Sequence, residues 1–201
     1  MAVNLQKGQK VDLTKGNAGL KKVMVGLGWD EAEKSGGGFL SGLFSGKKVD
    51  IDCDAIAFLL DANGRIPDKS DVIYFGNLSH KSGCVKHMGD NLTGAGEGDD
   101  EQVLIDLANM PPKYDKIVIL VSIYEATNRG QHFGMIQNAF IRIVDADTNK
   151  ELCQFNLTED YSGKISMVFG ELYRHAGEWK FAAVGEGLSI SSVSQLAARY
   201  K

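Results

Sequence analysis

A glycine-rich segment, residues 89–101, has the residue types most able to bind an ion. Its oxygen-bearing side chains are Asp90, Asn91, Thr93, Glu97, Asp99, Asp100 and Glu101. Carboxylates at this density repel one another unless a cation is present, and Ca²⁺ takes about 6–8 oxygen ligands. Glycines allow the backbone to curl so that several ligands converge. The spacing favours a calcium site; the alternatives are a solvated acidic loop and a magnesium or phosphate site.

A second acidic cluster consists of Asp50, Asp52 and Asp54, at positions i, i+2 and i+4. On a β-strand this spacing directs all three side chains to one face. Three ionised carboxylates on one face cost stability unless a cation or basic side chains offset them. Asp30 follows Trp29 at the end of a preceding strand and reaches the same region if the two strands are neighbours. We therefore expect the two clusters to meet at one end of the fold and to share one or two calcium ions.

Neither acidic segment follows the EF-hand pattern. A loop that begins at Asp50 has Ala55 where the pattern requires glycine, and a strand follows it instead of a helix. A loop that begins at Asp90 has Leu92 and Gly94 at ligand positions. Neither segment is therefore interpreted as an EF-hand.

Catalytic motifs are scarce in the sequence. The four histidines, at positions 80, 87, 132 and 175, lack the spacing of a zinc site, and we interpret them as surface or edge-strand residues. No phosphate-binding loop and no nucleophile elbow is present. The sequence therefore does not predict an enzyme. A metal-dependent hydrolase that uses the acidic cluster is the alternative, because such clusters also hold catalytic metals.

The elements that position these residues are predicted to be short strands. Alternation of apolar and polar residues, with turn signals in between, predicts strands at residues 23–29, 49–60, 72–75, 103–107, 116–124, 139–144, 152–157, 165–173 and 179–185. The 24 glycines against 3 prolines are typical of tight turns. This pattern predicts a mainly all-β protein, with a single antiparallel β-sandwich domain spanning residues 1–201. We expect a short C-terminal helix, capped by Ser191 or Ser192, that packs on an end of the sandwich.

An apolar, glycine-rich insertion interrupts this pattern at residues 35–48. Phe39, Leu40, Leu43 and Phe44 stand there among glycines and serines. Flexible loops seldom expose so much apolar surface. One interpretation is a hairpin folded back on the sandwich edge. The other is a loop that inserts into a membrane or a partner near the metal site.

Composition and charge restrict the environment and the partners. The formal net charge is −4, so no basic surface is expected to attract nucleic acid. Cys53, Cys84 and Cys153 are odd in number and widely spaced, which indicates reduced thiols. The sequence has neither a secretion signal nor an apolar run of about 20 residues. These features predict a soluble, cytoplasmic protein.

Several motifs occur in order along most of the chain: Gly26-Leu-Gly-Trp-Asp30, Asp52-x-Asp-x-x-Ala-Phe-Leu-Leu-Asp61, Gly89-Asp-Asn-Leu-Thr-Gly94, Gly98-Asp-Asp-Glu101, Ile123-Tyr124, Asn138-Ala-Phe-Ile-Arg142, Phe169-Gly-Glu-Leu-Tyr173 and Glu178-Trp-Lys-Phe181. In this order and spacing they resemble the TerD family of bacterial tellurium-resistance and stress proteins. The chain departs from the family pattern in the apolar insertion and at Asp54-Ala-Ile, where a small polar residue is often found.

The resemblance implies a calcium-binding β-sandwich that takes part in resistance to tellurite and other stresses and has no established enzymatic activity. The implied metal-site residues are Asp30, Asp52, Asp54, Asp90, Asn91, Asp99, Asp100 and Glu101, with Thr93 and Gly94 shaping the loop. We expect a metal-gated interaction module: calcium orders the acidic loops, and the sandwich end then engages protein partners of the same stress system or the inner membrane.

Overall fold

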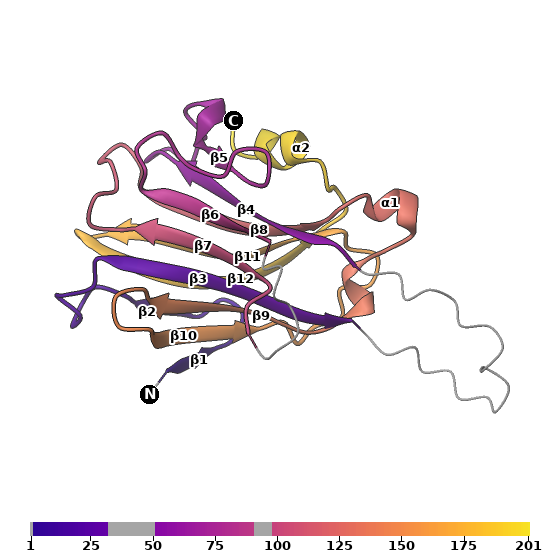
Figure 1. Cartoon of the computed structure of the whole chain (residues 1–201), viewed down its shortest axis with the longest axis horizontal. Helices are drawn as coiled ribbons and strands as arrows, with labels where there is room; N and C mark the ends of the chain where they lie inside the picture. The colour runs from indigo at the N-terminus through magenta and orange to yellow at the C-terminus, as the bar shows by residue number, and fades with distance from the viewer. Residues whose placement is uncertain (1, 32–50, 91–97) are drawn as a thin grey trace, which may run out of the picture.

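In the computed structural model, the chain folds into two six-stranded β-sheets (Figure 1). The structure describes residues 2–31, 51–90 and 98–201. The first sheet has the order β1 (Val3–Leu5), β10 (Lys150–Asn156), β9 (Ile136–Asp145), β3 (Lys22–Glu31), β7 (Glu101–Asp106), β6 (Val85–Asp90). The second has the order β2 (Lys10–Asp12), β12 (Glu178–Leu188), β11 (Ser166–His175), β8 (Lys116–Ile123), β4 (Cys53–Leu60), β5 (Val72–Ile73). Neighbouring strands are antiparallel except β1 and β10, which pair in parallel. The predicted all-β sandwich is confirmed.

Strand alternation places the main core between the two sheets. On β7, Val103 and Ile105 are fully buried, while Gln102, Leu104 and Asp106 are partly exposed. Strand β3 repeats this pattern with Val23, Val25 and Leu27. This period of two is what a strand with one buried face requires. The outward residues of the first sheet are therefore available to form a site.

Strands β4 and β8 of the second sheet are buried on both faces, and helix α2 (Val193–Ala198) packs on their outer face (Figure 1). Leu196 is fully buried there, and the ring of Tyr200 meets that of Phe58 edge-on at 5.6 Å between centroids. The predicted C-terminal helix is confirmed, with Ser192 at its N-cap. Our expectation that it packs on an end of the sandwich is wrong, because the outer face of β4, β8 and β11 is itself apolar.

The remaining elements are short and were not predicted. They are strands β1, β2 and β6, helix α1 (Ala126–Arg129), and the 3-10 helices η2 (Lys69–Asp71) and η3 (Phe133–Met135). None of the helices within the described ranges has both the length and the hydropathy needed to cross a membrane. The apolar insertion at residues 35–48 lies outside the described residues.

Candidate functional site

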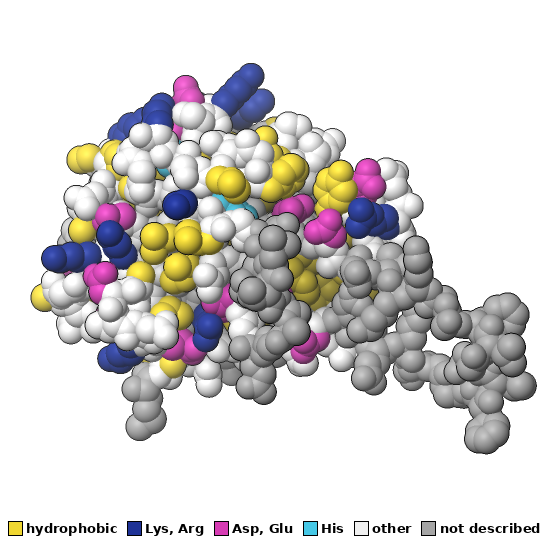
Figure 2. Space-filling view, in the orientation of Figure 1, with side chains coloured by type: hydrophobic (Ala, Val, Ile, Leu, Met, Phe, Trp, Pro, Cys, Tyr) yellow, Lys and Arg dark blue, Asp and Glu magenta, His cyan; other side chains and the backbone are white. Residues whose placement is uncertain are grey.

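The predicted acidic residues are brought to one end of the sandwich by four strands. Strand β3 ends there, and β4 begins there after the grey trace in Figure 1. Because β7 is antiparallel to β3, it also begins at this end, where Leu27 pairs with Glu101. Asp90, the last residue of β6, pairs through its backbone with Glu101. Acidic side chains are visible at this end of the molecule in Figure 2.

Asp99 is held on the outer face of the first sheet by two side chains. Its Oδ1 accepts a hydrogen bond of 2.7 Å from Arg142 Nε, and its Oδ2 accepts one of 2.9 Å from Gln102 Nε2. Arg142 and Gln102 are the two residues that pair with Gly26, one from each neighbouring strand. The carboxylate of Asp99 therefore lies over Gly26 with a donor on each side.

Glycine is required at position 26 because of this arrangement. A Cβ built on Gly26 would lie 2.3 Å from the carboxylate carbon and oxygens of Asp99. Gly28 is two residues further along and thus on the same face. A Cβ built on Gly28 would lie 2.4 Å from the ring of Phe140. Because the two glycines have no side chains, the side chains of Asp99 and Phe140 can approach the backbone of β3 closely.

Glu101 connects the two sheets from inside the sandwich. Its side chain is only 4% exposed, and its Oε2 accepts a hydrogen bond of 3.1 Å from the backbone N–H of Ala55, on β4 of the other sheet. The same oxygen lies 2.8 Å from Nε2 of His87, which is 1% exposed. His87 is therefore a buried partner of Glu101. Our interpretation of the histidines as surface or edge-strand residues fails here in part, since His87 is on edge strand β6 but faces the core.

Asp100 and Asp30 lie on the outer side of the same end. Asp100 Oδ2 accepts a hydrogen bond of 2.8 Å from the backbone N–H of Trp29, and Asp30 Oδ2 accepts one of 2.8 Å from Asn138 Nδ2. Asn138 belongs to a bulge in β9, where the pairing with β3 slips by one residue and φ is +53°. Bulges often redirect side chains next to functional sites. Here the bulge directs Asn138 toward Asp30.

An open hollow of about 650 Å³ brings these two carboxylates together. Its lining consists of aromatic, amide and acidic residues: Trp29, Asp30, Gly98, Asp100, Asn138, Phe140, Gln154, Asn156, Leu157 and Thr158. A volume of this size suits a small ligand or the projecting side chains of a partner. Gly98, where description of the chain resumes after residues 91–97, lies on its wall.

The electrostatics of this end are unfavourable to negative charge. Burial raises the pKa of Asp100, and the carboxylates of Asp30 and Asp99 raise it further, while the hydrogen bond from Trp29 lowers it. Burial also raises the pKa of Cys53 well above its ordinary value. The carboxylates that add to the shift at Cys53 are Asp54, Asp52, Glu101 and Asp100. Carboxylates at the start of β4 and at the start of β7 are therefore all close enough to Cys53 to disfavour its thiolate.

Asp54 lies on β4 of the second sheet and Asp52 directly precedes that strand, so the two flank the inward-facing Cys53. Asp52 is exposed, with its carboxylate 4.0 Å from the guanidinium of Arg129. Asp54 is partly buried and pairs with Ser122 of β8. The alternation of β4 places Asp54 on the outer side of the second sheet, opposite the inward-facing Cys53 and Ala55. Of the other predicted ligands, Asn91, Thr93, Gly94 and the side chain of Asp90 lie outside what the structure describes.

Within the described ranges, no three His, Cys, Asp or Glu side chains converge as a complete metal centre. The sequence reasoning also missed the residues that hold the predicted carboxylates: Gly26, Gln102, Arg142, Asn138 and His87. A signal for one of them was present. Gly26 and Gly28 are two residues apart on a predicted strand, which indicates a backbone that another segment approaches closely.

Comparisons with known proteins agree with this architecture. The TerD domain model matches residues 1–200. Stress response protein SCP2 of Bacillus subtilis (strain 168) is 53% identical over 200 residues, which cover 100% of both chains. Tellurium resistance protein TerD of Serratia marcescens is 44% identical over 200 residues, covering 100% of this chain and 97% of the relative.

A solved structure shares the fold. The crystal structure of a homologue of telluride resistance protein (TerD) from Streptomyces coelicolor A3(2) superposes with a TM-score of 0.62 at 21% identity. The match covers 90% of this chain and 98% of the other. The names of these relatives refer to resistance and stress, and none of them names an enzymatic activity.

Proposed function

This chain belongs to the TerD family of tellurium-resistance and general stress-response proteins, and from that premise we propose that it is a non-enzymatic, calcium-dependent interaction module. In this proposal the acidic end of the sandwich binds one or two Ca²⁺ ions. The ordered end then engages protein partners of the same stress system in the cytoplasm, at or near the inner membrane.

One observation carries the calcium proposal: Asp30 and Asp100 line the same hollow beside Gly98, where the glycine-rich segment rejoins the described chain. Each uses its Oδ2 to accept a hydrogen bond, Asp100 from the Trp29 N–H and Asp30 from Asn138 Nδ2. Burial and the neighbouring carboxylates raise the pKa of Asp100, because the ionised forms of Asp100 and Asp30 repel each other. A bound cation would relieve that repulsion.

The donor atoms available suit calcium better than a soft metal. Ca²⁺ prefers carboxylate, amide and backbone carbonyl oxygens, and the hollow presents the carboxylates of Asp30 and Asp100 and the amide of Asn138. The full proposed ligand set is Asp30, Asp52, Asp54, Asp90, Asn91, Thr93, Gly94, Asp99, Asp100 and Glu101. Within it, we assign Asp30 and Asp100 the direct role.

Asp99 and Glu101 support the site in this account. Asp99 fixes the segment on the first sheet through Arg142 and Gln102, and Glu101 fixes it to the second sheet through Ala55. Because Asp100 lies between these two fixed residues in the chain, its position at the hollow is fixed as well. Bound calcium would supply positive charge that neutralises the acidic end and orders the ligands around it, which favours the folded state by mass action.

Growth under tellurite stress tests the biological part of the proposal. A bacterial strain that lacks the gene is complemented with the wild type, with Asp30→Asn/Asp100→Asn, and with a control that removes two exposed charges elsewhere, Asp147→Asn/Glu186→Gln. We expect the wild type and the control to restore tolerance and the first variant to fail at equal protein level. Full rescue by Asp30→Asn/Asp100→Asn would contradict a role for this site.

Association with a membrane is a separate part of the proposal and rests on the apolar residues of the insertion at 35–48. Sedimentation with vesicles of anionic lipid, in calcium and in chelator, tests it. We expect calcium-dependent sedimentation that Phe39→Ser/Phe44→Ser abolishes. If the wild type stays in the supernatant under both conditions, partners of the module are proteins only.

A further inference from the structure

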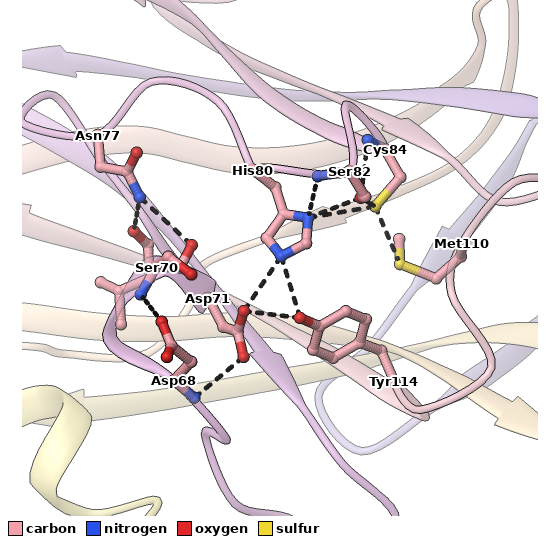
Figure 3. Close-up of polar contacts among 10 residues, drawn as sticks. Asp68, Ser70, Asp71, Asn77, His80, Ser82, Cys84, Met110 and Tyr114 are labelled. Atoms are coloured by element: carbon pink, nitrogen blue, oxygen red, sulfur yellow. Dashed lines mark hydrogen bonds and ion pairs between the residues drawn. The ribbon is translucent and has the colours of Figure 1, made fainter.

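A second group of chemically active residues lies buried between η2, the turn before β6 and the loop before β8, outside the acidic segment (Figure 3). It contains Asp71, His80 and Tyr114, with Ser82, Cys84 and Met110 beside them. His80 is 3% exposed, so our interpretation of it as a surface or edge-strand histidine is wrong.

One imidazole nitrogen of His80 is fixed by a buried carboxylate. His80 Nε2 lies 3.1 Å from Asp71 Oδ1 and 3.0 Å from the Tyr114 hydroxyl, which itself donates to Asp71 Oδ1 at 2.6 Å. An ionised Asp71 makes Nε2 the protonated nitrogen, because a carboxylate oxygen only accepts. Consistent with this tautomer, the other nitrogen, Nδ1, accepts a hydrogen bond of 3.1 Å from the backbone N–H of Ser82.

Two sulfur atoms lie beside that second nitrogen. Cys84 Sγ is 3.8 Å from His80 Nδ1 and 3.4 Å from Met110 Sδ (Figure 3). Ligands that bind one ion at about 2.0–2.3 Å are themselves about 3.3–4 Å apart. The two spacings from Cys84 Sγ fall in this range. The hydroxyl of Ser82 lies between nitrogen and thiol, 2.6 Å from each.

We propose that His80 Nδ1, Cys84 Sγ and Met110 Sδ form a binding site for a soft monovalent cation of the Cu(I) or Ag(I) type. Thiolate and thioether sulfur select such ions, and imidazole also binds copper. The contact of His80 with Asp71 is the arrangement that orients metal-binding histidines in proteins, with the outer nitrogen donating to a carboxylate. This site is independent of the acidic end, whose oxygen donors do not suit soft ions.

Binding requires a proton exchange at Cys84 and release of the hydrogen bonds from Ser82 to Nδ1 of His80. Burial raises the pKa of Cys84, so the thiol is protonated at neutral pH. The incoming ion forms bonds to Sγ, Sδ and Nδ1, and the thiol proton leaves to water; no group changes oxidation state. Ser82 lies in an exposed turn at residues 81–83, so its hydroxyl can withdraw to admit the ion.

Competition for Cu(I) with a chromophoric chelator, under anaerobic conditions, tests the proposal on the full chain. We expect the wild type to take up one equivalent and Cys84→Ser to take up none at the same chelator concentration. Met110→Leu, which conserves volume, should weaken binding by at least about tenfold, the smaller loss seen for outer-shell changes at metal sites. Cys153→Ala, which removes a buried thiol on β10, should bind like the wild type.

Two results would overturn the proposal. One is a wild type that removes no Cu(I) from the chelator. The other is an equal loss in Cys84→Ser and Cys153→Ala, which would indicate non-specific thiol binding. Melting curves of the copper-free variants identify any that do not fold, and Met110→Leu then decides the question, because Leu replaces Met in cores at low cost.

Discussion

The carboxylate of Asp99 lies directly over the backbone of Gly26, where a Cβ would stand 2.3 Å from its atoms. This contact fixes the start of β7 on the first sheet, because Asp99 is also bound by Arg142 and Gln102. Asp99, the residue before Asp100, is therefore positioned by a glycine on a strand far away in the sequence.

Substitution Gly26→Ala should displace Asp99 and destabilise the protein. The added methyl group cannot be accommodated without moving the carboxylate, and such overpacking costs about 1–3 kcal/mol. Urea denaturation measures the loss. The matched control is Gly19→Ala, since a Cβ at Gly19 meets nothing within 4 Å. Equal effects of the two substitutions would contradict the assigned contact.

Glu101→Gln should destabilise the junction of the two sheets. Gln keeps an acceptor for the Ala55 N–H but loses the charge opposite His87, and weakening a buried polar pair costs about 1–3 kcal/mol. Thermal melting checks this value. Glu151→Gln is the control, because its carboxylate is 29% exposed and lies 3.5 Å from Arg142, a pair worth about 0–1 kcal/mol. A larger loss in the control would show that Glu101 is not the connecting residue.

Leu196→Ala should reveal the contribution of helix α2 to stability. The side chain of Leu196 is fully buried on the outer face of the second sheet, and removing it costs about 2–5 kcal/mol. Gln195→Ala, at the exposed position next to it, should change stability by less than about 0.5 kcal/mol. Chemical denaturation of both variants provides the comparison. A loss below that of the control would mean that α2 is docked only weakly.

Asp100→Asn should stabilise the protein in chelator at neutral pH. The pKa of Asp100 is raised in the fold, so between its ordinary value of 3.8 and the folded value the native state binds more protons than the unfolded state. Stability therefore falls as pH rises through that window, and the ionised group is unfavourable above it. Melting from pH 3 to pH 7 should show a smaller decline in the variant. An identical pH profile would contradict the raised pKa.

The sequence predicts the strands better than it predicts the contacts between them. Alternation identified β3 and β7, because each has one apolar face. The edge strands β1 and β2 escaped prediction because they have only three residues each. Strand β6 escaped it because one of its buried positions is the polar residue His87, which hides the apolar alternation. The acidic residues were found by their density, but their hydrogen-bond partners were not. Arg142, for example, is 43 residues from Asp99 in the sequence and meets it only in the folded chain.

In the structure, three residues that the sequence predicted to be metal ligands have different surroundings. Asp99, Asp100 and Glu101 are consecutive, yet Asp99 binds over the first sheet, Asp100 faces the hollow and Glu101 enters the sandwich. Strand alternation alone cannot divide these roles, because the segment turns at its junction with β7. The soft-donor cluster at Cys84 was equally hidden, because Met110 reaches it from another loop.

The most direct test of the central claim is calorimetric titration of the chelator-stripped protein with calcium, with melting curves in parallel. The account predicts heat of binding and a raised melting temperature for the wild type and for Asp147→Asn/Glu186→Gln, and loss of both for Asp30→Asn/Asp100→Asn. A melting temperature that rises with ligand concentration is the expected mass-action response. Absence of heat and of any shift in the wild type up to millimolar calcium would contradict the calcium site and leave an acidic surface on a β-sandwich.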